Sequence, residues 1–406
     1  MSRDFDVVII GAGMVGASLA CALAPAGLRI AIIEVVPLKD NSQSSYDDRG
    51  ITLSPSSKRI LESIGVWQDV QQQANAIKKI HVSEQGRFGF ARLDAVEESC
   101  SELGHVVVAR SLGQALHKQL SDYENISLIC PAELKHFHRH GAGMTVEIAH
   151  SEKIESINTG LLVGADGGNS LVRRLAGINT NEQDYKQTAI VANVTTQRAN
   201  QSTAYERFTV HGPIAFLPID KNRSVLVFTV DEGNAQRYLN MSDDQFIRAV
   251  ETEFGRRLGR IEQIGQRRSY PIRFVEAIEQ FQEQLILLGN AAHTIHPNAA
   301  QGFNLGLRDV AGLAECIFAG LEKGLAIGDI SLLENYLALR SPDQQRVMRL
   351  TNRIAESFYN NFPLLVPARN LALLILDAIP DIKASFVQQA MGLSGLQPRL
   401  IRSEKL

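Results

Sequence analysis

Short apolar runs alternate with helix-like segments along the first part of the chain. Residues 7–10 are an apolar, β-branched run, as expected of a parallel strand buried on both faces. The small-residue segment 17–26 predicts a helix that ends near Pro25 and Gly27, and residues 29–33 predict a second strand. Strand, helix and strand in this order are typical of a βαβ unit with a parallel sheet.

The pattern changes in the middle of the chain. Alternating apolar and polar positions predict antiparallel strands at 189–196, 204–210, 214–218 and 224–230, and an amphipathic helix at 243–254. Buried-type strands at 159–163 and 285–288 flank this region, and helices are expected at 302–320 and 330–376. We therefore predict a discontinuous nucleotide-binding domain of residues 1–179 and 276–361. A mostly antiparallel β-sheet domain of 180–275 is inserted into it, and 362–406 form a helical C-terminal segment.

Three glycines stand where the first strand must turn into the first helix. Gly11, Gly13 and Gly16 form the spacing G-x-G-x-x-G, and Glu34 stands at the end of the second strand. Gly11 permits the tight turn, Gly13 leaves room for a pyrophosphate, and Gly16 allows close packing of helix and strand. A carboxylate at position 34 can accept hydrogen bonds from ribose hydroxyls. These residues predict an adenine-dinucleotide site without distinguishing NAD from FAD.

Two later stretches repeat the chemistry of a ligand crevice. Asp166 and Gly167 follow the strand at 159–163, at the carboxyl edge where open α/β sheets bind ligands. The stretch 289–309 follows the strand at 285–288, and Gly302 precedes a helix. The free N–H groups of that helix would suit an electron-rich ring carbonyl.

Composition excludes several classes of function. The 406 residues suggest two packed domains, and a net charge of −3 gives no support for a nucleic-acid partner. Four widely spaced cysteines predict neither a disulfide framework nor a metal site. The alternate His136, His138 and His140 are expected to be solvent-exposed strand residues. The polar stretch 40–46 is expected to be a solvated loop, and the absence of a signal peptide favours the cytoplasm.

The three stretches around Gly11, Asp166 and Gly302 resemble the three fingerprints of the class A FAD-dependent aromatic hydroxylases. The segments 205–213 and 301–309 and Trp67 further resemble the ubiquinone-biosynthesis branch, most closely the hydroxylases of 2-polyprenyl-6-methoxyphenol. The resemblance covers almost the whole chain. It implies an α/β fold like that of para-hydroxybenzoate hydroxylase, with a Rossmann-like FAD-binding domain. It also implies FAD as cofactor and NADH or NADPH as electron donor.

The resemblance also implies roles for individual residues. The cofactor-binding residues would be Gly11, Gly13 and Gly16 at the pyrophosphate, Glu34 at the ribose, Arg49, Arg110 and Gln114 along the FAD, and Asp166, Asn290, Gly302, Phe303 and Asn304. The backbone of the last three would hold the pyrimidine end of the ring, and the Pro297 carbonyl would lie near the reacting edge. Tyr270, before Pro271, is a further catalytic candidate at the substrate face. The wider family has Asp where this chain has Asn290, and a neutral hydrogen bond is roughly half as strong as a charge-assisted one.

The implied reaction is hydroxylation of a polyprenylated methoxyphenol ring in ubiquinone biosynthesis. NAD(P)H would reduce FAD, O₂ would form a flavin hydroperoxide, and its distal oxygen would pass to the ring. His293 and His296 could act as acid–base residues, but a structural role beside FAD is favoured. Three alternatives stay open: a sister hydroxylase acting at another ring carbon, an FAD-dependent lipid reductase, and a non-catalytic flavoprotein of a biosynthetic complex.

A polyprenyl substrate implies contact with a membrane or a lipid-carrying partner, since each buried CH₂ contributes about 0.8 kcal/mol. The most apolar terminal segment is 363–379, but Arg369, Asn370 and Asp377 exclude a simple span. A helix packed on the FAD domain is favoured over a membrane-facing one. We expect a cytoplasmic homo-oligomer that associates with other ubiquinone-biosynthesis proteins. Peripheral contact with the inner face of the plasma membrane stays open.

Overall fold

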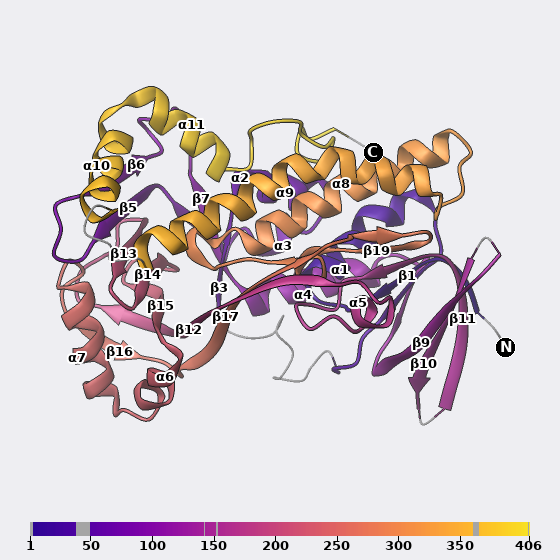
Figure 1. Cartoon of the computed structure of the whole chain (residues 1–406), viewed down its shortest axis with the longest axis horizontal. Helices are drawn as coiled ribbons and strands as arrows, with labels where there is room; N and C mark the ends of the chain where they lie inside the picture. The colour runs from indigo at the N-terminus through magenta and orange to yellow at the C-terminus, as the bar shows by residue number, and fades with distance from the viewer. Residues whose placement is uncertain (1–2, 38–48, 142, 152, 360–364, 405) are drawn as a thin grey trace.

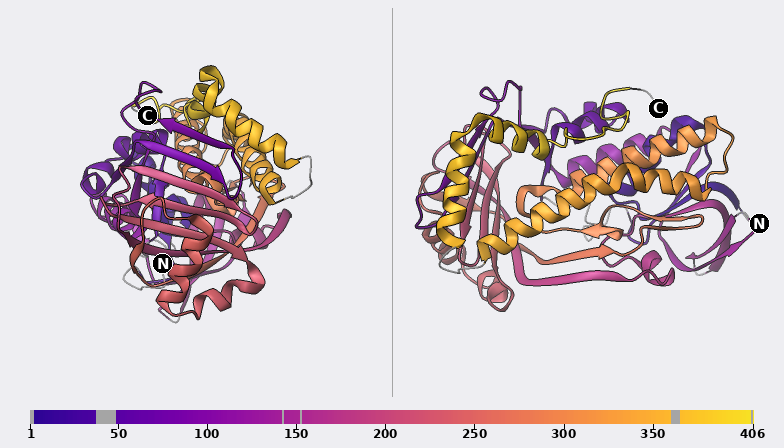
Figure 2. Two further views of the ribbon diagram at one scale, coloured as in Figure 1. Left: turned by 90° about the vertical axis from the view of Figure 1, so that its left-hand side faces the viewer. Right: turned by 45° about the horizontal axis from the view of Figure 1, so that its top comes forward.

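The computed structural model describes residues 3–37, 49–141, 143–151, 153–359, 365–404 and 406 (Figure 1). The predicted loop at 40–46, the predicted domain boundary at 361–362 and the first two residues of the segment 363–379 lie outside these ranges. Two large sheets stand toward opposite ends of the molecule, and long helices run from one to the other (Figures 1 and 2).

The first sheet contains the predicted parallel strands. Its order is β18-β19-β11-β1-β2-β8, with β10 paired antiparallel to β11 and β9 paired antiparallel to β10. The bounds are β1 (Arg3–Ile10), β2 (Ile30–Ile33), β8 (Ile126–Ile129), β9 (Ala132–His140), β10 (Gly143–His150), β11 (Lys153–Gly164), β18 (Phe281–Gln282) and β19 (Leu285–Leu287). Val7 and Ile9 pack into the core on one face of β1, and Val8 and Ile10 pack into the core on the other. The prediction of a strand buried on both faces is confirmed.

Helices cover this sheet and connect its strands. They are α1 (Met14–Leu23), the 3₁₀ turn η1 (Ala24–Ala26), α2 (Pro55–Ser63), α3 (Trp67–Val70), α4 (Ala109–Ser121) and α5 (Leu171–Leu175). A small sheet β3-β7-β4 lies beside them, formed by β3 (Gly50–Leu53), β4 (Asn75–Ile77) and β7 (Gly104–Val108). The first helix begins at Met14, three residues before the predicted start at 17, because its N-cap is Gly13 in extended conformation.

The second sheet is antiparallel apart from one parallel pair, β13 with β5. Its order is β20-β17-β12-β15-β14-β13-β5-β6, with β16 beside β12. The bounds are β5 (Lys79–Glu84), β6 (Phe90–Asp94), β12 (Thr180–Thr196), β13 (Thr203–Thr209), β14 (Gly212–Pro218), β15 (Arg223–Asp231), β16 (Ile261–Ile264), β17 (Arg268–Ala277) and β20 (His293–Thr294), with helices α6 (Glu232–Leu239) and α7 (Asp243–Phe254) packed on it. The hairpin β5–β6 lies within the range predicted for the nucleotide-binding domain yet pairs into this sheet. The predicted domain ranges stay a prediction.

The last part of the chain is helical. The elements are η3 (Gly289–Ala291), η4 (Asn298–Ala300), α8 (Gly302–Glu322), α9 (Ile330–Tyr359), α10 (Leu365–Ala378) and α11 (Pro380–Ala390). Helices α8 and α9 lie side by side across the top of the molecule, and α10 and α11 lie at the end occupied by the second sheet (Figures 1 and 2). The predicted mixed α/β fold with a helical C-terminal region is confirmed.

Candidate cofactor-binding site

The glycine loop has the stereochemistry that a dinucleotide fingerprint requires. Gly11 has φ +106°, and a Cβ there would lie 2.5 Å from the Ala165 carbonyl oxygen. A Cβ on Gly16 would lie 2.1 Å from the Gly11 carbonyl oxygen, so helix and loop touch at this point. A Cβ on Gly13 would meet nothing within 4 Å. The loop is therefore closed at Gly11 and Gly16 and open at Gly13, which fits a pyrophosphate approaching there.

Glu34 binds the glycine loop directly. Its Oε2 accepts a hydrogen bond from the Ala12 backbone N–H at 2.8 Å, and Oε1 accepts one from Val36 N–H at 2.8 Å. The side chain is buried. Because a carboxylate offers about four lone-pair directions, these bonds leave acceptor capacity for ribose hydroxyls. Glu34 thus holds the loop in place as well as standing at the predicted ribose position.

Asp166 lies beside the glycine loop, since β11 pairs with β1 and ends next to it. Its Oδ2 accepts hydrogen bonds from Leu171 N–H at 2.6 Å and Val172 N–H at 3.1 Å, which fixes the start of α5. Its Oδ1 is buried and has no hydrogen-bond partner among the described residues. A buried carboxylate oxygen without a donor is costly, so this atom fits a site completed by a ligand hydroxyl.

The third stretch packs onto the first through Val15. A Cβ on Gly289 would lie 3.1 Å from the Val15 side chain, and one on Gly306 would lie 3.0 Å from it. Arg173 ties the second stretch to the third by donating to the carbonyls of Ala291 at 2.7 Å and Gly168 at 2.8 Å. The three stretches therefore meet at the carboxyl edge of the parallel sheet. Asn290 is exposed at this edge.

The loop before α8 is anchored from three sides. Asn298 Nδ2 donates to Thr351 O on α9 at 2.9 Å, and Gln301 Nε2 donates to Ala390 O on α11 at 3.2 Å. The Asn304 side chain donates to two carbonyls, Thr52 O and Ala300 O, and its Oδ1 accepts from Ser54 N–H and Ser57 Oγ–H. This side chain is fully engaged, so only its backbone is available to a cofactor.

Pro297 stands exposed at the start of this loop, and its carbonyl accepts a hydrogen bond from Ala300 N–H at 3.0 Å. Ala300 has φ +48°, a conformation that costs a non-glycine residue about 1–3 kcal/mol. A Cβ on Gly302 would meet only Ile295, at 3.8 Å, and Phe303 packs partly buried against the core. The first N–H groups of α8 have no carbonyl partner within the helix.

The two histidines of the loop are structural. His293 Nε2 lies 2.6 Å from Asp309 Oδ2 in the core. Burial alone would raise the pKa of Asp309, but Arg340 and His293 beside it hold that pKa at about 2. His296 Nδ1 accepts from Asn298 N–H at 3.1 Å, and burial lowers its pKa to about 4. Both imidazoles are buried and contact polar groups of the protein, which fits the structural role that the sequence favours.

Two predicted residues from distant segments meet at the other side of the site. The guanidinium carbon of Arg49 lies 4.6 Å from the centre of the Tyr270 ring on β17. The Arg49 carbonyl accepts from Ala109 N–H at 2.8 Å, which places Arg110 next to it at the start of α4. Gln114 is exposed on α4. The roles of all these residues toward a cofactor stay predictions.

Sequence reasoning missed the anchoring residues. Val15, Asn304 and Ala390 hold the three stretches and the loop together, but nothing in their local sequence indicates it. For Asn304, the sequence predicts only a backbone contact with the cofactor. Among the described residues, no group of His, Cys, Asp or Glu side chains could hold a metal ion.

Comparison with known proteins agrees with this geometry. The sequence model of the family described as "FAD binding domain" matches residues 4–351. The chain is 34% identical to the ubiquinone hydroxylase UbiL of Rhodospirillum rubrum, over 99% of this chain and 93% of that protein. It is 31% identical to the 3-demethoxyubiquinol 3-hydroxylase of Escherichia coli, over 97% and 100%. Among solved structures, the p-nitrophenol 4-monooxygenase PnpA of Pseudomonas putida superposes with a TM-score of 0.81 at 17% identity, covering 98% of this chain and 100% of that one.

Proposed function

Because this chain belongs to the FAD-binding-domain family, and within it to the FAD-dependent aromatic hydroxylases of ubiquinone biosynthesis, we propose that it hydroxylates a polyprenylated methoxyphenol. The electron donor is NADH or NADPH and the oxidant is O₂. In the overall reaction, a ring C–H group, O₂, NAD(P)H and one proton give a ring C–OH group, water and NAD(P)⁺. The prenyl tail and the methoxy group take no part in this balance.

Two contacts between the second sheet and the segments of the candidate site support the proposal most. Tyr270, on the second sheet, lies against Arg49, which is joined through its carbonyl to the start of α4 beside the first sheet. Strand β20, formed by His293 and Thr294 of the third stretch, pairs with β17 of the second sheet. The second sheet is therefore hydrogen-bonded to the stretch that would hold the flavin. An aromatic ring bound on β17 would lie beside that stretch.

FAD, when bound, supplies the redox chemistry and the activation of O₂. The residues of this chain bind and orient. The glycine loop and the N-terminus of α1 would receive the pyrophosphate, Glu34 the ribose, and the N-terminus of α8 the pyrimidine carbonyl. Pro297 would stand at the reacting edge, where its ring and the buried loop behind it help to exclude water. The buried histidines supply no proton in this scheme.

The names of the relatives support the substrate class but not the ring carbon. The R. rubrum relative is a ubiquinone hydroxylase, and the E. coli relative is named for the 3-position of demethoxyubiquinol. Hydroxylation at another carbon by a sister enzyme is therefore the second candidate function. Association with other ubiquinone-biosynthesis proteins and a homo-oligomeric state belong to the same proposal.

Lipid analysis of a strain lacking this gene tests the substrate. The proposal predicts that the strain accumulates a polyprenyl-methoxyphenol and that the wild-type gene removes it. Accumulation of an earlier or later ring intermediate would transfer the function to the second candidate. An unchanged amount of ubiquinone in the deletion strain, when no second hydroxylase is present, would contradict both candidate functions.

A further inference from the structure

Helix α10 carries its polar side chains on the inside. Arg369 donates to Glu84 through Nε at 3.0 Å, and Asn370 Nδ2 donates to the same carboxylate at 2.6 Å. Asp377 accepts from the Arg92 backbone N–H at 2.7 Å and from its guanidinium at 3.0 Å. These are the three residues whose polarity excluded a simple membrane span. The structure turns all three toward the β5–β6 hairpin.

The outward face of the same helix is apolar. Every exposed residue between 365 and 380 is apolar: Leu365, Pro367, Ala368, Leu371, Ala372, Ile375, Ala378, Ile379 and Pro380. Leu371 is 56% exposed, Ile375 is 38% exposed, and Ile382 on α11 is 45% exposed. We call these three residues the apolar row. A surface helix normally has the opposite arrangement, with apolar residues toward the core. Contiguous exposed apolar surface marks an interaction site.

The length of α10 decides how it could meet a bilayer. Its 14 residues span about 21 Å, less than the roughly 30 Å of a hydrocarbon core. Within the described part of the chain, no helix is long and apolar enough to cross a membrane. A short helix with one apolar face lies flat in the interface.

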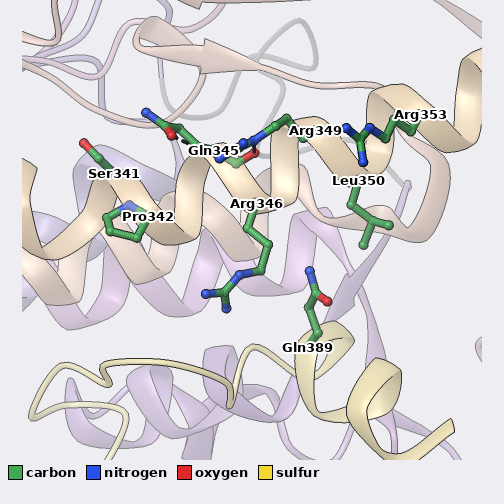
Figure 3. Close-up of a pocket in the computed structure, with 8 residues that line it drawn as sticks. All are labelled: Ser341, Pro342, Gln345, Arg346, Arg349, Leu350, Arg353 and Gln389. Carbon is green, nitrogen blue, oxygen red and sulfur yellow. Dashed lines mark hydrogen bonds between the residues drawn. The ribbon is translucent and has the colours of Figure 1, made fainter. Parts of the chain in front are cut away.

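A groove rich in arginine lies between α9 and α11. Arg346, Arg349 and Arg353 of α9 line an open groove of about 700 Å³ together with Gln389 of α11 (Figure 3). None of the three arginines forms an ion pair with another described residue. Gln389 lies seven positions after Ile382, so both are on one flank of α11. Ile382 and the groove therefore lie on the same side of α11.

We propose that the outward face of α10 and α11 docks flat on a bilayer containing anionic phospholipids. The apolar row enters the boundary between headgroups and acyl chains, and the arginines of α9 bind headgroup phosphates. Guanidinium groups suit phosphate oxygens, and each cation near an anionic surface contributes about 1 kcal/mol. The combination of an apolar row and a positively charged groove fits this surface. A second copy of the chain would bring an identical positively charged groove instead.

Hydrogen bonds connect α9 and α11 to the candidate site. The loop before α8 reaches α9 through Asn298 and Thr351, and α11 through Gln301 and Ala390. A lipid leaving the bilayer beside α11 would therefore start close to the loop that holds Pro297. The choice of a bilayer as partner rests in part on the proposed polyprenyl substrate, which resides in lipid.

Flotation with lipid vesicles tests the inference on the full-length protein. Vesicles of phosphatidylcholine alone are compared with vesicles that also contain phosphatidylglycerol. We expect the wild type to float with the second kind, and Leu371→Glu with Ile375→Glu to reduce the bound fraction about tenfold or more. The control Ile154→Glu replaces a side chain that is 70% exposed on β11 and should change nothing. Arg349→Gln with Arg353→Gln should reduce binding only to the anionic vesicles.

Three outcomes would overturn the inference. They are a wild type that does not float, a Leu371→Glu, Ile375→Glu variant that floats like the wild type, and a wild-type dimer that the same variant converts to a monomer without any vesicle binding. Bound FAD and the thermal midpoint report that each variant is folded. Flotation requires no turnover, so loss of docking and failure of the proposed hydroxylation are measured separately.

Discussion

The carboxylate of Glu34 accepts a hydrogen bond from the backbone N–H of Ala12, between Gly11 and Gly13, at 2.8 Å. The residue at the predicted ribose position is therefore also a brace of the phosphate-binding loop. Its two roles can be separated by experiment, because one is present without FAD and the other is not.

Replacing Glu34 by Gln should weaken FAD binding more than folding. The amide keeps one acceptor for Ala12 or Val36 but loses the charge-assisted bond to the ribose, so we expect about tenfold weaker binding, equivalent to about 1.4 kcal/mol. Glu34→Gln leaves one of these two backbone donors unpaired and Glu34→Ala leaves both, so the apoprotein should lose about 1–3 kcal/mol of stability in Glu34→Ala and less in Glu34→Gln. Flavin fluorescence titration and urea unfolding measure the two effects. Glu124→Gln, at an exposed position, is the control.

Substitutions of the loop glycines should have different effects on FAD binding and on stability. Gly13→Ala places a methyl group where the protein leaves open space, so the stability of the apoprotein should be unchanged. The variant should bind FAD at least tenfold more weakly, because the methyl group occupies the space of the pyrophosphate. Gly16→Ala forces a contact with the Gly11 carbonyl and should lower the stability of the apoprotein itself. Gly233→Ala, on α6 with no atom near its Cβ, should leave FAD binding intact. Equal loss of stability in Gly13→Ala and Gly16→Ala would contradict the open-loop geometry.

The free energy of unfolding should fall at acid pH because His296 is buried in its neutral form. Its unfolded pKa is near 6.5 and burial lowers the folded pKa to about 4, so the unfolded chain binds the extra proton first. The stabilisation is complete above pH 6.5 and is lost as the pH falls toward 4, by up to about 3 kcal/mol. His296→Gln should flatten this part of a pH series of urea unfolding, offset by its own packing cost. The exposed His138→Gln should not, and an unchanged slope in His296→Gln would refute this cause.

The contact between Arg49 and Tyr270 decides what Tyr270 does. Tyr270→Phe keeps the ring face that the guanidinium contacts, whereas Tyr270→Leu removes it. If Tyr270 is a positioning residue, Tyr270→Phe should retain kcat and its pH profile, and Tyr270→Leu should weaken FAD or substrate binding by about 0.5–1 kcal/mol. A double-mutant cycle with Arg49→Gln measures the coupling. A large loss of kcat in Tyr270→Phe with a shifted pH profile would instead assign a catalytic role to the hydroxyl.

The sequence predicted the elements whose formation depends on neighbouring residues. The glycine loop, the buried strands and the helix at 243–254 carry their own signals, and α7 was predicted with its observed bounds. The first half of β12 is polar, from Thr180 to Gln187, and pairs with β17 almost ninety residues later, so no nearby pattern marked it. The hairpin β5–β6 joins the second sheet through β13, which is still more remote in sequence, since Lys79 pairs with Thr203.

Side-chain orientation was the part that sequence could not supply. Arg369, Asn370 and Asp377 were visible as polar interruptions of an apolar segment, but their inward orientation depends on Glu84 and Arg92, nearly three hundred positions away. The same holds for His293, whose partner Asp309 forms a buried network with Arg340. Long-range partners, rather than periodicity, assign these residues their roles.

Oxygen-18 labelling tests whether O₂ supplies the oxygen of the new ring hydroxyl. The purified protein, loaded with FAD, is supplied with NADH or NADPH, a short-chain prenyl methoxyphenol and ¹⁸O₂, and the product is analysed by mass spectrometry. We expect one new ring hydroxyl that carries a single ¹⁸O atom from ¹⁸O₂, and no label when ¹⁸O is supplied as water instead. Oxidation of NAD(P)H with no label in the ring would contradict it and would favour the FAD-dependent lipid reductase.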